Sequence, residues 1–88
     1  MNLVYTTQFK KDFKRILSQG KDTKKIETVI RLLLKKEKLD QQYKDHSLSG
    51  KWKNHRDCHI EPDWILIYSA TKNNLILERT GSHSELFK

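Results

Sequence analysis

The sequence predicts an α+β fold, in which a twisted antiparallel sheet of about four strands carries an N-terminal helix hairpin on one face. Apolar residues recur at helical spacing as far as residue 37 and at strand spacing over residues 51–80. A short apolar segment precedes both, so the element order is β–α–α–β–β–β. The chain of 88 residues fits one domain, 1–88, and is too short for a second core.

The first half of the chain is predicted to form a strand and two antiparallel helices. Residues 2–6 are expected to be a short strand. The first helix begins at Thr6 or Thr7 and stops at Gly20, and its apolar face comprises Phe9, Phe13, Ile16 and Leu17. The second helix spans 23–37 behind Asp22 or Thr23, and its buried stripe comprises Ile26, Val29, Ile30, Leu33 and Leu34. The short link between the helices makes them a hairpin.

The second half is predicted to be a loop followed by a three-stranded meander. Residues 38–50 have no sustained period. The strand over 51–60 is expected to present Trp52, Asn54, Arg56, Cys58 and Ile60 on one face, and Lys53, His55, Asp57 and His59 on the other. Pro62 marks a turn, because proline cannot donate to a ladder. Residues 64–70 are apolar on both faces and therefore central, and 75–80 form the last strand. The sheet face away from the helices is expected to stay open for a partner.

The charge balance indicates a polyanionic partner in a reducing compartment. Lys and Arg number 18 against 11 Asp and Glu, giving a net charge of +7 and a pI near 9.6. Such a chain is attracted to nucleic acid, an acidic protein or an anionic membrane surface. The basic face of the first helix is expected to be solvated, with a polyanion-binding stripe as the alternative; it comprises Lys10, Lys11, Lys14 and Arg15. Cys58 is the single cysteine, which excludes an internal disulfide. With no apolar stretch of the roughly 20 residues that a membrane span needs, we expect a cytoplasmic protein.

Four histidines in the second half raise the possibility of proton-transfer chemistry. They are His46, His55, His59 and His83, with Asp45, Asp57 and Asp63 nearby in the sequence. A shared metal ion is disfavoured, because His55 and His59 on one strand would lie roughly 13 Å apart. Metal-free cleavage of RNA is the second reading, since it needs a base for the 2′-hydroxyl, an acid for the leaving oxygen and a cation for the phosphorane. Composition and spacing leave both readings open, beside a third in which the histidines are scattered surface residues.

Four motifs, taken in chain order, decide between these readings. They are K-D-H at 44–46, L-x-G-x-W-K at 48–53, R-D-x-H-x-E-P-D-W-x-L-x-Y at 56–68 and R-T-G-[ST]-H-x-x-L-F at 79–87. Together with the helix hairpin they resemble the YafQ branch of the RelE/ParE-type bacterial toxins over essentially the whole chain. The resemblance implies a RelE-like fold and a type II toxin that cuts messenger RNA on the ribosome without a cofactor or a metal. It also implies a cognate antitoxin that covers the open surface and assembles with the toxin into a higher-order complex.

The resemblance also implies the site residues. The family's catalytic positions fall on His46, His59, Asp63, His83 and Phe87. We assign His83 as general acid, His46 and His59 as base and charge carriers, Asp63 as base or orienting group, and Phe87 as a base-stacking residue or a core anchor. Arg79 is the expected phosphate clamp, with Lys53 and Arg56 as weaker candidates. His55 lies outside the pattern and is expected to be an ordinary surface residue, while Trp52, Trp64 and Tyr68 are expected to pack.

Two alternatives from other functional classes remain at this point. One is a basic binding module that occupies nucleic acid or protein without cutting it, including a gyrase-type toxin of the same fold. The other is a degenerate toxin that keeps the fold and its antitoxin but cuts weakly, because the motif residues do not by themselves guarantee a productive geometry.

Overall fold

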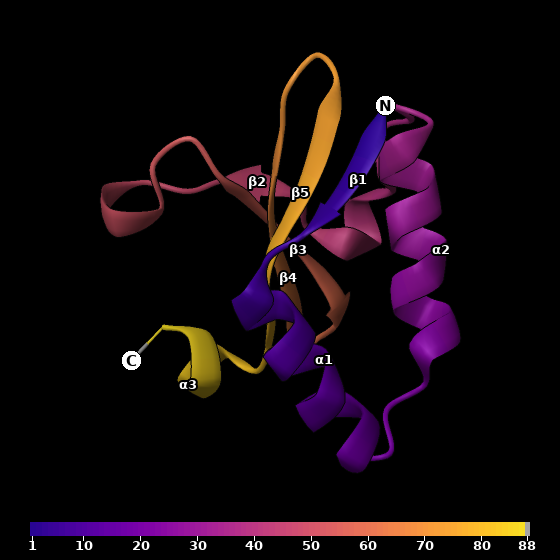
Figure 1. Cartoon of the computed structure of the whole chain (residues 1–88), viewed down its shortest axis with the longest axis vertical. Helices are drawn as coiled ribbons and strands as arrows, with labels where there is room; N and C mark the ends of the chain where they lie inside the picture. Colours follow the sequence, from indigo (N-terminus) through magenta and orange to yellow (C-terminus); the bar gives the residue numbers. More distant parts are fainter. Residues whose placement is uncertain (88) are drawn as a thin grey trace.

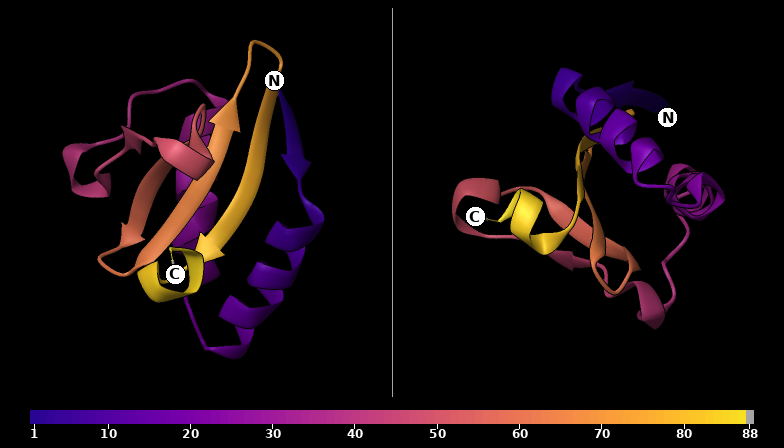
Figure 2. Two further views of the ribbon diagram at one scale, coloured as in Figure 1. Left: turned by 90° about the vertical axis from the view of Figure 1, so that its left-hand side faces the viewer. Right: turned by 90° about the horizontal axis from the view of Figure 1, so that it is seen from below.

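A five-stranded sheet with two helices on one face is the frame of the molecule (Figures 1 and 2). The computed structural model describes residues 1–87. The strands are β1 (Asn2–Tyr5), β2 (His46–Ser47), β3 (Arg56–Glu61), β4 (Trp64–Ala70) and β5 (Asn74–Gly81), in the spatial order β1-β5-β4-β3-β2. The helices are α1 (Thr7–Ser18), α2 (Thr23–Leu34) and α3 (His83–Leu86), and single 3₁₀ turns occur at η1 (Gln41–Tyr43) and η2 (Gly50–Trp52). The predicted α+β class and the predicted meander of β3, β4 and β5 are confirmed.

The sheet differs from the prediction at both of its edges. β1 pairs in parallel with β5, from Asn2 opposite Asn74 to Tyr5 opposite Leu77, so the sheet is mixed and not wholly antiparallel. At the other edge, β2 adds a fifth strand of two residues, antiparallel to β3. The direction of β1 could not be read from its residues, because a strand that reaches its neighbour through helices can run either way.

The helix hairpin begins as predicted but differs in its end and in its buried face. Thr6 caps α1 by accepting from the amide of Phe9, and the buried residues of α1 are Phe9, Asp12 and Ile16. Leu17, expected on the buried face, is 51% exposed. Asp22 caps α2, which ends at Leu34, before the predicted residue 37, because Lys36 adopts a left-handed φ of 58°.

Strand β3 starts later than the sequence predicts. Residues 50–55 form η2 and a turn, in which Gly50 and Asn54 have φ angles of 63° and 70°. This left-handed backbone breaks the two-residue alternation, so Trp52 does not share a face with Cys58. The strand begins only at Arg56.

Apolar residues pack on both faces of β4, as predicted for a central strand. On the helix side, Trp64, Leu66 and Tyr68 pack with residues of both helices, including Phe9 and Ile26. On the opposite face the cluster comprises Ile65, Ile67, Leu86, Leu48 and Trp52. The expectation of an open face is therefore wrong in part, since α3 and the η2 loop cover some of it (Figure 2).

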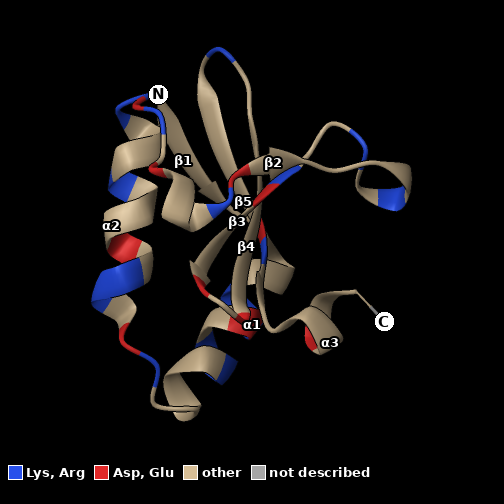
Figure 3. Cartoon of the chain, turned by 180° about the vertical axis from the view of Figure 1, so that it is seen from behind, with Lys and Arg blue, Asp and Glu red and all other residues tan. Residues whose placement is uncertain are grey.

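Basic residues are spread over the surface and do not gather on one helix. Figure 3 shows Lys and Arg on α1, on α2 and in the loop that contains η2. Among residues 1–87, no helix has the length and apolar character required to cross a bilayer.

Candidate active site

Three histidines from separate elements form a row. His46 lies in β2, His59 in β3 and His83 at the first position of α3. Their ring centroids are 6.5 Å apart between His46 and His59, and 5.3 Å apart between His59 and His83. Phe87 continues the series, with its ring centroid 6.2 Å from that of His83. We call His46, His59, His83 and Phe87 the ring row.

In two members of the ring row, one ring nitrogen contacts the protein backbone. Nδ1 of His46 lies 2.8 Å from the carbonyl oxygen of Lys44, and Nδ1 of His59 lies 3.3 Å from that of Pro62. A carbonyl oxygen can only accept, so these contacts favour the tautomer with the proton on Nδ1. In this tautomer Nε2 carries a free lone pair and can take a proton from a substrate.

Asp63 binds His83 in a different way. Its Oδ1 accepts from the backbone amide of His83 at 2.9 Å and from ring Nδ1 at 2.9 Å. The backbone N–H of His83, followed by its side chain, holds the pKa of Asp63 below its usual range. Of the two sequence assignments for Asp63, this geometry favours the orienting group, because the same oxygen already accepts twice.

Asp57 is a candidate functional residue that the sequence assignments missed. It faces His46 across the β2–β3 pair and is only 3% exposed. Its Oδ1 lies 3.0 Å from Nδ1 of His46 but makes no hydrogen bond of good geometry. Burial raises the pKa of Asp57, and the nearby imidazoles of His46, His59 and His83 oppose that effect. The strand alternation that groups Asp57 with His59 was the available signal.

The loop that carries His46 is anchored from the helix-covered side of the sheet. Asp45 accepts from Tyr68 Oη, and from Nη2 and Nε of Arg56 at 3.1 and 3.3 Å. Arg56 lies opposite Tyr68 in the β3–β4 ladder and alternates with Asp57, so it points away from the ring row. The structure therefore does not bring Arg56 to the histidines, and gives it a contact that holds the loop.

Arg79 and Lys53 lie in different surroundings. Arg79 is half-buried, and its Nε and Nη2 bind Asp12 of α1 at 2.7 and 3.1 Å. Nη1 makes neither of these bonds, and the side chain borders a hollow with Trp52 and Phe87. Lys53 is exposed in the turn after η2 and has no contact that ties it to the ring row.

Hollows with basic residues adjoin the ring row at its Phe87 end and beside His59. The one bordered by Phe87 measures about 580 Å³ and is also lined by Arg79 and Lys51. The one bordered by His59 measures about 490 Å³ and is lined by Lys25 and Lys44. A strand of nucleic acid that crosses the row would therefore meet cations on either side.

His55 is not the ordinary surface residue that the sequence predicts. It is half-buried, its Nε2 lies 2.9 Å from Glu78 Oε2, and its ring is nearly perpendicular to that of Trp52 at a centroid distance of 5.2 Å. Burial lowers the pKa of this imidazole, but the contact with Glu78 and nearby backbone carbonyls outweigh burial and raise it. The contact joins the turn before β3 to β5 and lies outside the ring row.

Metal-ligating side chains are not clustered in the part of the chain that the structure describes. Over residues 1–87, no group of three or more His, Cys, Asp or Glu has the geometry to hold an ion. The free thiol of Cys58 is buried, which raises its pKa above the usual range and makes it a poor ligand or nucleophile.

Comparison with known proteins places this geometry in a family. Residues 1–88 match the family described as the bacterial toxin of type II toxin-antitoxin system, YafQ. The mRNA interferase toxin YafQ of Escherichia coli strain K12 is 45% identical over 87 residues, which cover 98% of this chain and 95% of that protein.

Solved structures agree with the sequence match. A copper-bound L66S mutant toxin from Helicobacter pylori superposes with a TM-score of 0.95 at 49% identity, over 99% of each chain. YafQ in the Escherichia coli DinJ–YafQ complex superposes with a TM-score of 0.92 at 44% identity, over 99% of this chain and 98% of that one. The chain described here belongs to the YafQ family of bacterial toxins of type II toxin–antitoxin systems.

Proposed function

We propose that this toxin is a ribosome-dependent endoribonuclease that cuts messenger RNA without a metal ion. The observation that carries the proposal is the ring row, in which the imidazole centroids from β2, β3 and α3 lie 6.5 and 5.3 Å apart. Its support is the family membership and the name mRNA interferase given to the relative that is 45% identical. Two histidines at this spacing can serve opposite sides of one phosphodiester.

The reaction we propose is attack by the ribose 2′-hydroxyl on the adjacent 3′-phosphate. Nε2 of His46 or His59 takes the hydroxyl proton as the bond between 2′-oxygen and phosphorus forms. Nε2 of His83 donates a proton to the 5′-oxygen as its bond to phosphorus breaks. The products are a 2′,3′-cyclic phosphate and a 5′-hydroxyl end. DNA lacks the nucleophile and is not cut.

The remaining residues have supporting roles in this scheme. Asp63 orients His83, because it holds both the ring Nδ1 and the backbone amide. Whichever of His46 and His59 does not act as the base stabilises the charge of the phosphorane when it is protonated, together with Nη1 of Arg79. Phe87 at the end of the ring row stacks on a neighbouring base.

Mapping RNA 5′-ends after inducing the toxin alone in a bacterium tests the proposal. We expect new ends at a fixed position within codons of translated messages, since a ribosome-dependent enzyme cuts in the decoding site. Ends that are scattered without regard to reading frame would argue against ribosome dependence. The absence of new ends, with growth arrest intact, would favour a non-catalytic or gyrase-directed toxin.

Replacing His83 by Ala tests the assignment of the general acid. We expect cleavage to fall by about 100- to 10,000-fold, the usual contribution of a positioned acid or base. His55→Ala is the matched control, because it removes an imidazole that lies outside the ring row, and we expect it to cleave normally. A His83→Ala protein that cleaves as the unaltered chain does would end the assignment.

The proposed partner is a cognate antitoxin that covers the ring row and assembles with the toxin into a larger complex. Its support is the complex of the Escherichia coli relative with DinJ. The toxin has a net charge of +7, so an antitoxin segment with acidic residues would be complementary. We expect His83→Ala to bind the antitoxin undiminished in a pull-down, because one exposed side chain contributes little to a large interface. Loss of binding would show that the antitoxin contacts His83 directly.

A further inference from the structure

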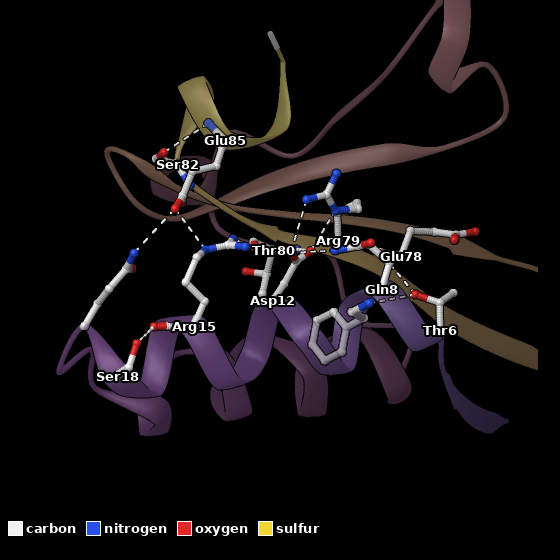
Figure 4. A network of polar contacts seen from close by, with 12 residues as sticks. Thr6, Gln8, Asp12, Arg15, Ser18, Glu78, Arg79, Thr80, Ser82 and Glu85 are labelled. Atoms are coloured by element: carbon white, nitrogen blue, oxygen red, sulfur yellow. Dashed lines mark hydrogen bonds and ion pairs between the residues drawn. The ribbon is translucent and has the colours of Figure 1, made fainter.

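A fully buried carboxylate on α1 organises the end of β5. Asp12 is 0% exposed. It accepts hydrogen bonds from Arg79 Nε at 2.7 Å, from the backbone amide of Thr80 at 3.2 Å and from Arg15 Nη1 at 2.9 Å (Figure 4). Burial raises the pKa of this carboxyl, but the contacts with Arg79, Arg15 and Thr80 outweigh it and hold the pKa below the usual range. Asp12 is therefore an ionised anchor.

Arg15 extends this anchor to the C-terminal helix. Its Nη1 binds Asp12, its Nη2 donates to the carbonyl of Thr80 at 2.9 Å, and its Nε lies 2.9 Å from Glu85 Oε2. The contact with Glu85 is ionic, since its angle does not give a hydrogen bond. One guanidinium thus joins α1, β5 and α3. The prediction that Arg15 lies on a solvated face of α1 is therefore wrong.

Glu85 connects the bridge to the start of α3. Its Oε1 accepts from the backbone amide of Ser82 at 2.8 Å, and the hydroxyl of Ser82 accepts from the amide of Glu85 at 3.2 Å, which makes a capping box. The backbone N–H of Ser82 is the main cause that lowers the pKa of Glu85, and Arg15 contributes to the same effect. The residue next to Ser82 is His83, so the cap and the proposed general acid are adjacent.

A helix of this length needs such support. α3 spans only His83–Leu86, a single turn, and one isolated turn is not stable in water. Its apolar anchor is Leu86, which packs on Ile65 and Ile67. Asp63 holds the first residue of this turn through the amide and ring of His83, and the ionic contact from α1 adds a third point at Glu85.

We propose that Arg15 and Glu85 are positioning residues, whose bridge from α1 holds His83 and Phe87 in the ring row. The inference rests on the proposed function, because it assigns the bridge to the same site. Neither residue touches RNA in this scheme. Their effect passes through the orientation of α3, and we expect it to alter kcat more than KM.

Three variants and one control separate positioning from general stability. Arg15→Met removes the bridge and keeps an unbranched side chain, and Lys11→Met is its control one turn earlier on the exposed face of α1. Glu85→Ala breaks the contact at its far end, where little of the core is disturbed. Glu85→Gln keeps an oxygen that can complete the capping box but removes the negative charge, so it tests the ionic contact separately from the cap.

The first measurement is mRNA cleavage on programmed ribosomes. We expect kcat to fall about 10- to 100-fold in Arg15→Met and Glu85→Ala, the scale of a misplacement near 1 Å. Glu85→Gln should fall with them, because it lacks the charge that pairs with Arg15, and Lys11→Met should stay within about twofold of the unaltered chain. Unchanged kcat in both bridge variants would overturn the proposal.

The second measurement, NMR of the imidazole resonances, does not depend on activity. In Arg15→Met and Glu85→Ala we expect the His83 ring signals to shift or broaden, while those of His46, at the far end of the row, stay in place. Equal changes at all histidines would mean general destabilisation and would overturn the positioning role. If the unaltered chain cuts no mRNA, the proposed function fails, and the resonances still decide whether the bridge places His83.

Discussion

At the scale of single residues, one ring nitrogen of each histidine in the ring row contacts another group of the protein. Nδ1 of His46 and of His59 contacts a backbone carbonyl, and Nδ1 of His83 contacts the carboxylate of Asp63. The carboxylate of Asp57 also lies 3.0 Å from Nδ1 of His46. The neighbours of each ring thus occupy Nδ1 and leave Nε2 as the nitrogen that can face a substrate.

Asp57 gives a prediction at this scale, because its burial has a cost. Burial makes its pKa higher in the folded than in the unfolded chain. The ionised carboxylate therefore lowers the stability of the fold at neutral pH, and replacing it by an amide relieves that cost. For Asp57→Asn we expect an unchanged or higher Tm at pH 7.5, together with cleavage reduced about tenfold through the loss of the contact with His46.

Thermal melting and cleavage assays on the same Asp57→Asn preparation check this expectation. A lower Tm with normal cleavage would show that Asp57 serves the fold and not the ring row.

At the scale of elements, the site depends on contacts that join segments distant in the sequence. The pair of His55 and Glu78 ties the turn before β3 to β5, and Trp52 packs against it. The pKa of His55 is raised by this contact. The stabilisation it gives is therefore complete below the unfolded pKa of about 6.5 and is lost as the pH rises through the folded value.

Glu78→Gln should accordingly destabilise the protein at pH 6 more than at pH 8.5. The difference should be about 1 kcal/mol or less, because both side chains are partly exposed. Urea denaturation at the two pH values measures it, with the exposed Glu37→Gln as control. An equal loss at both values would mean that the imidazole is not charged in this pair.

Gly81 shows how closely α3 approaches α1. A Cβ at this position would lie 2.5 Å from Arg15 Nη2 and 2.9 Å from Glu85 Oε1. Both atoms are ends of flexible side chains, so Gly81→Ala should push the bridge apart without removing either charge. We expect a loss of about 1–3 kcal/mol in unfolding free energy and reduced cleavage, with Ser84→Ala as the control on α3. A variant as stable and active as the unaltered chain would show that the bridge adapts.

At the scale of the whole molecule, periodicity predicted the parts that depend on local patterns. The helix starts at Thr6 and Asp22 and the central strand β4 follow from caps and apolar spacing, which are properties of neighbouring residues. The burial of Asp12 could not be predicted in this way, because a carboxylate on a helix is ordinarily expected to face solvent. Its partner Arg79 lies 67 residues further along the chain.

The residues of the candidate site also differ in whether the sequence alone could predict them. Spacing alone did not separate His55 from the other histidines, and family motifs did so by excluding it. The structure brings the rings of His46, His59 and His83 together, and their assignment as site residues and their roles stay predictions. Asp57 and the bridge of Arg15 and Glu85 were missed, since each depends on packing between elements.

Cleavage of an mRNA with one 2′-deoxynucleotide on the 5′ side of the scissile phosphate tests the central claim most directly. On programmed ribosomes, we expect the ordinary message to be cut to a 2′,3′-cyclic phosphate and a 5′-hydroxyl end. The substituted message should remain intact at that position, because it lacks the attacking oxygen. Cleavage of the deoxy-substituted message at the normal rate, or a 5′-phosphate end on the ordinary one, would contradict histidine-driven attack by the 2′-hydroxyl.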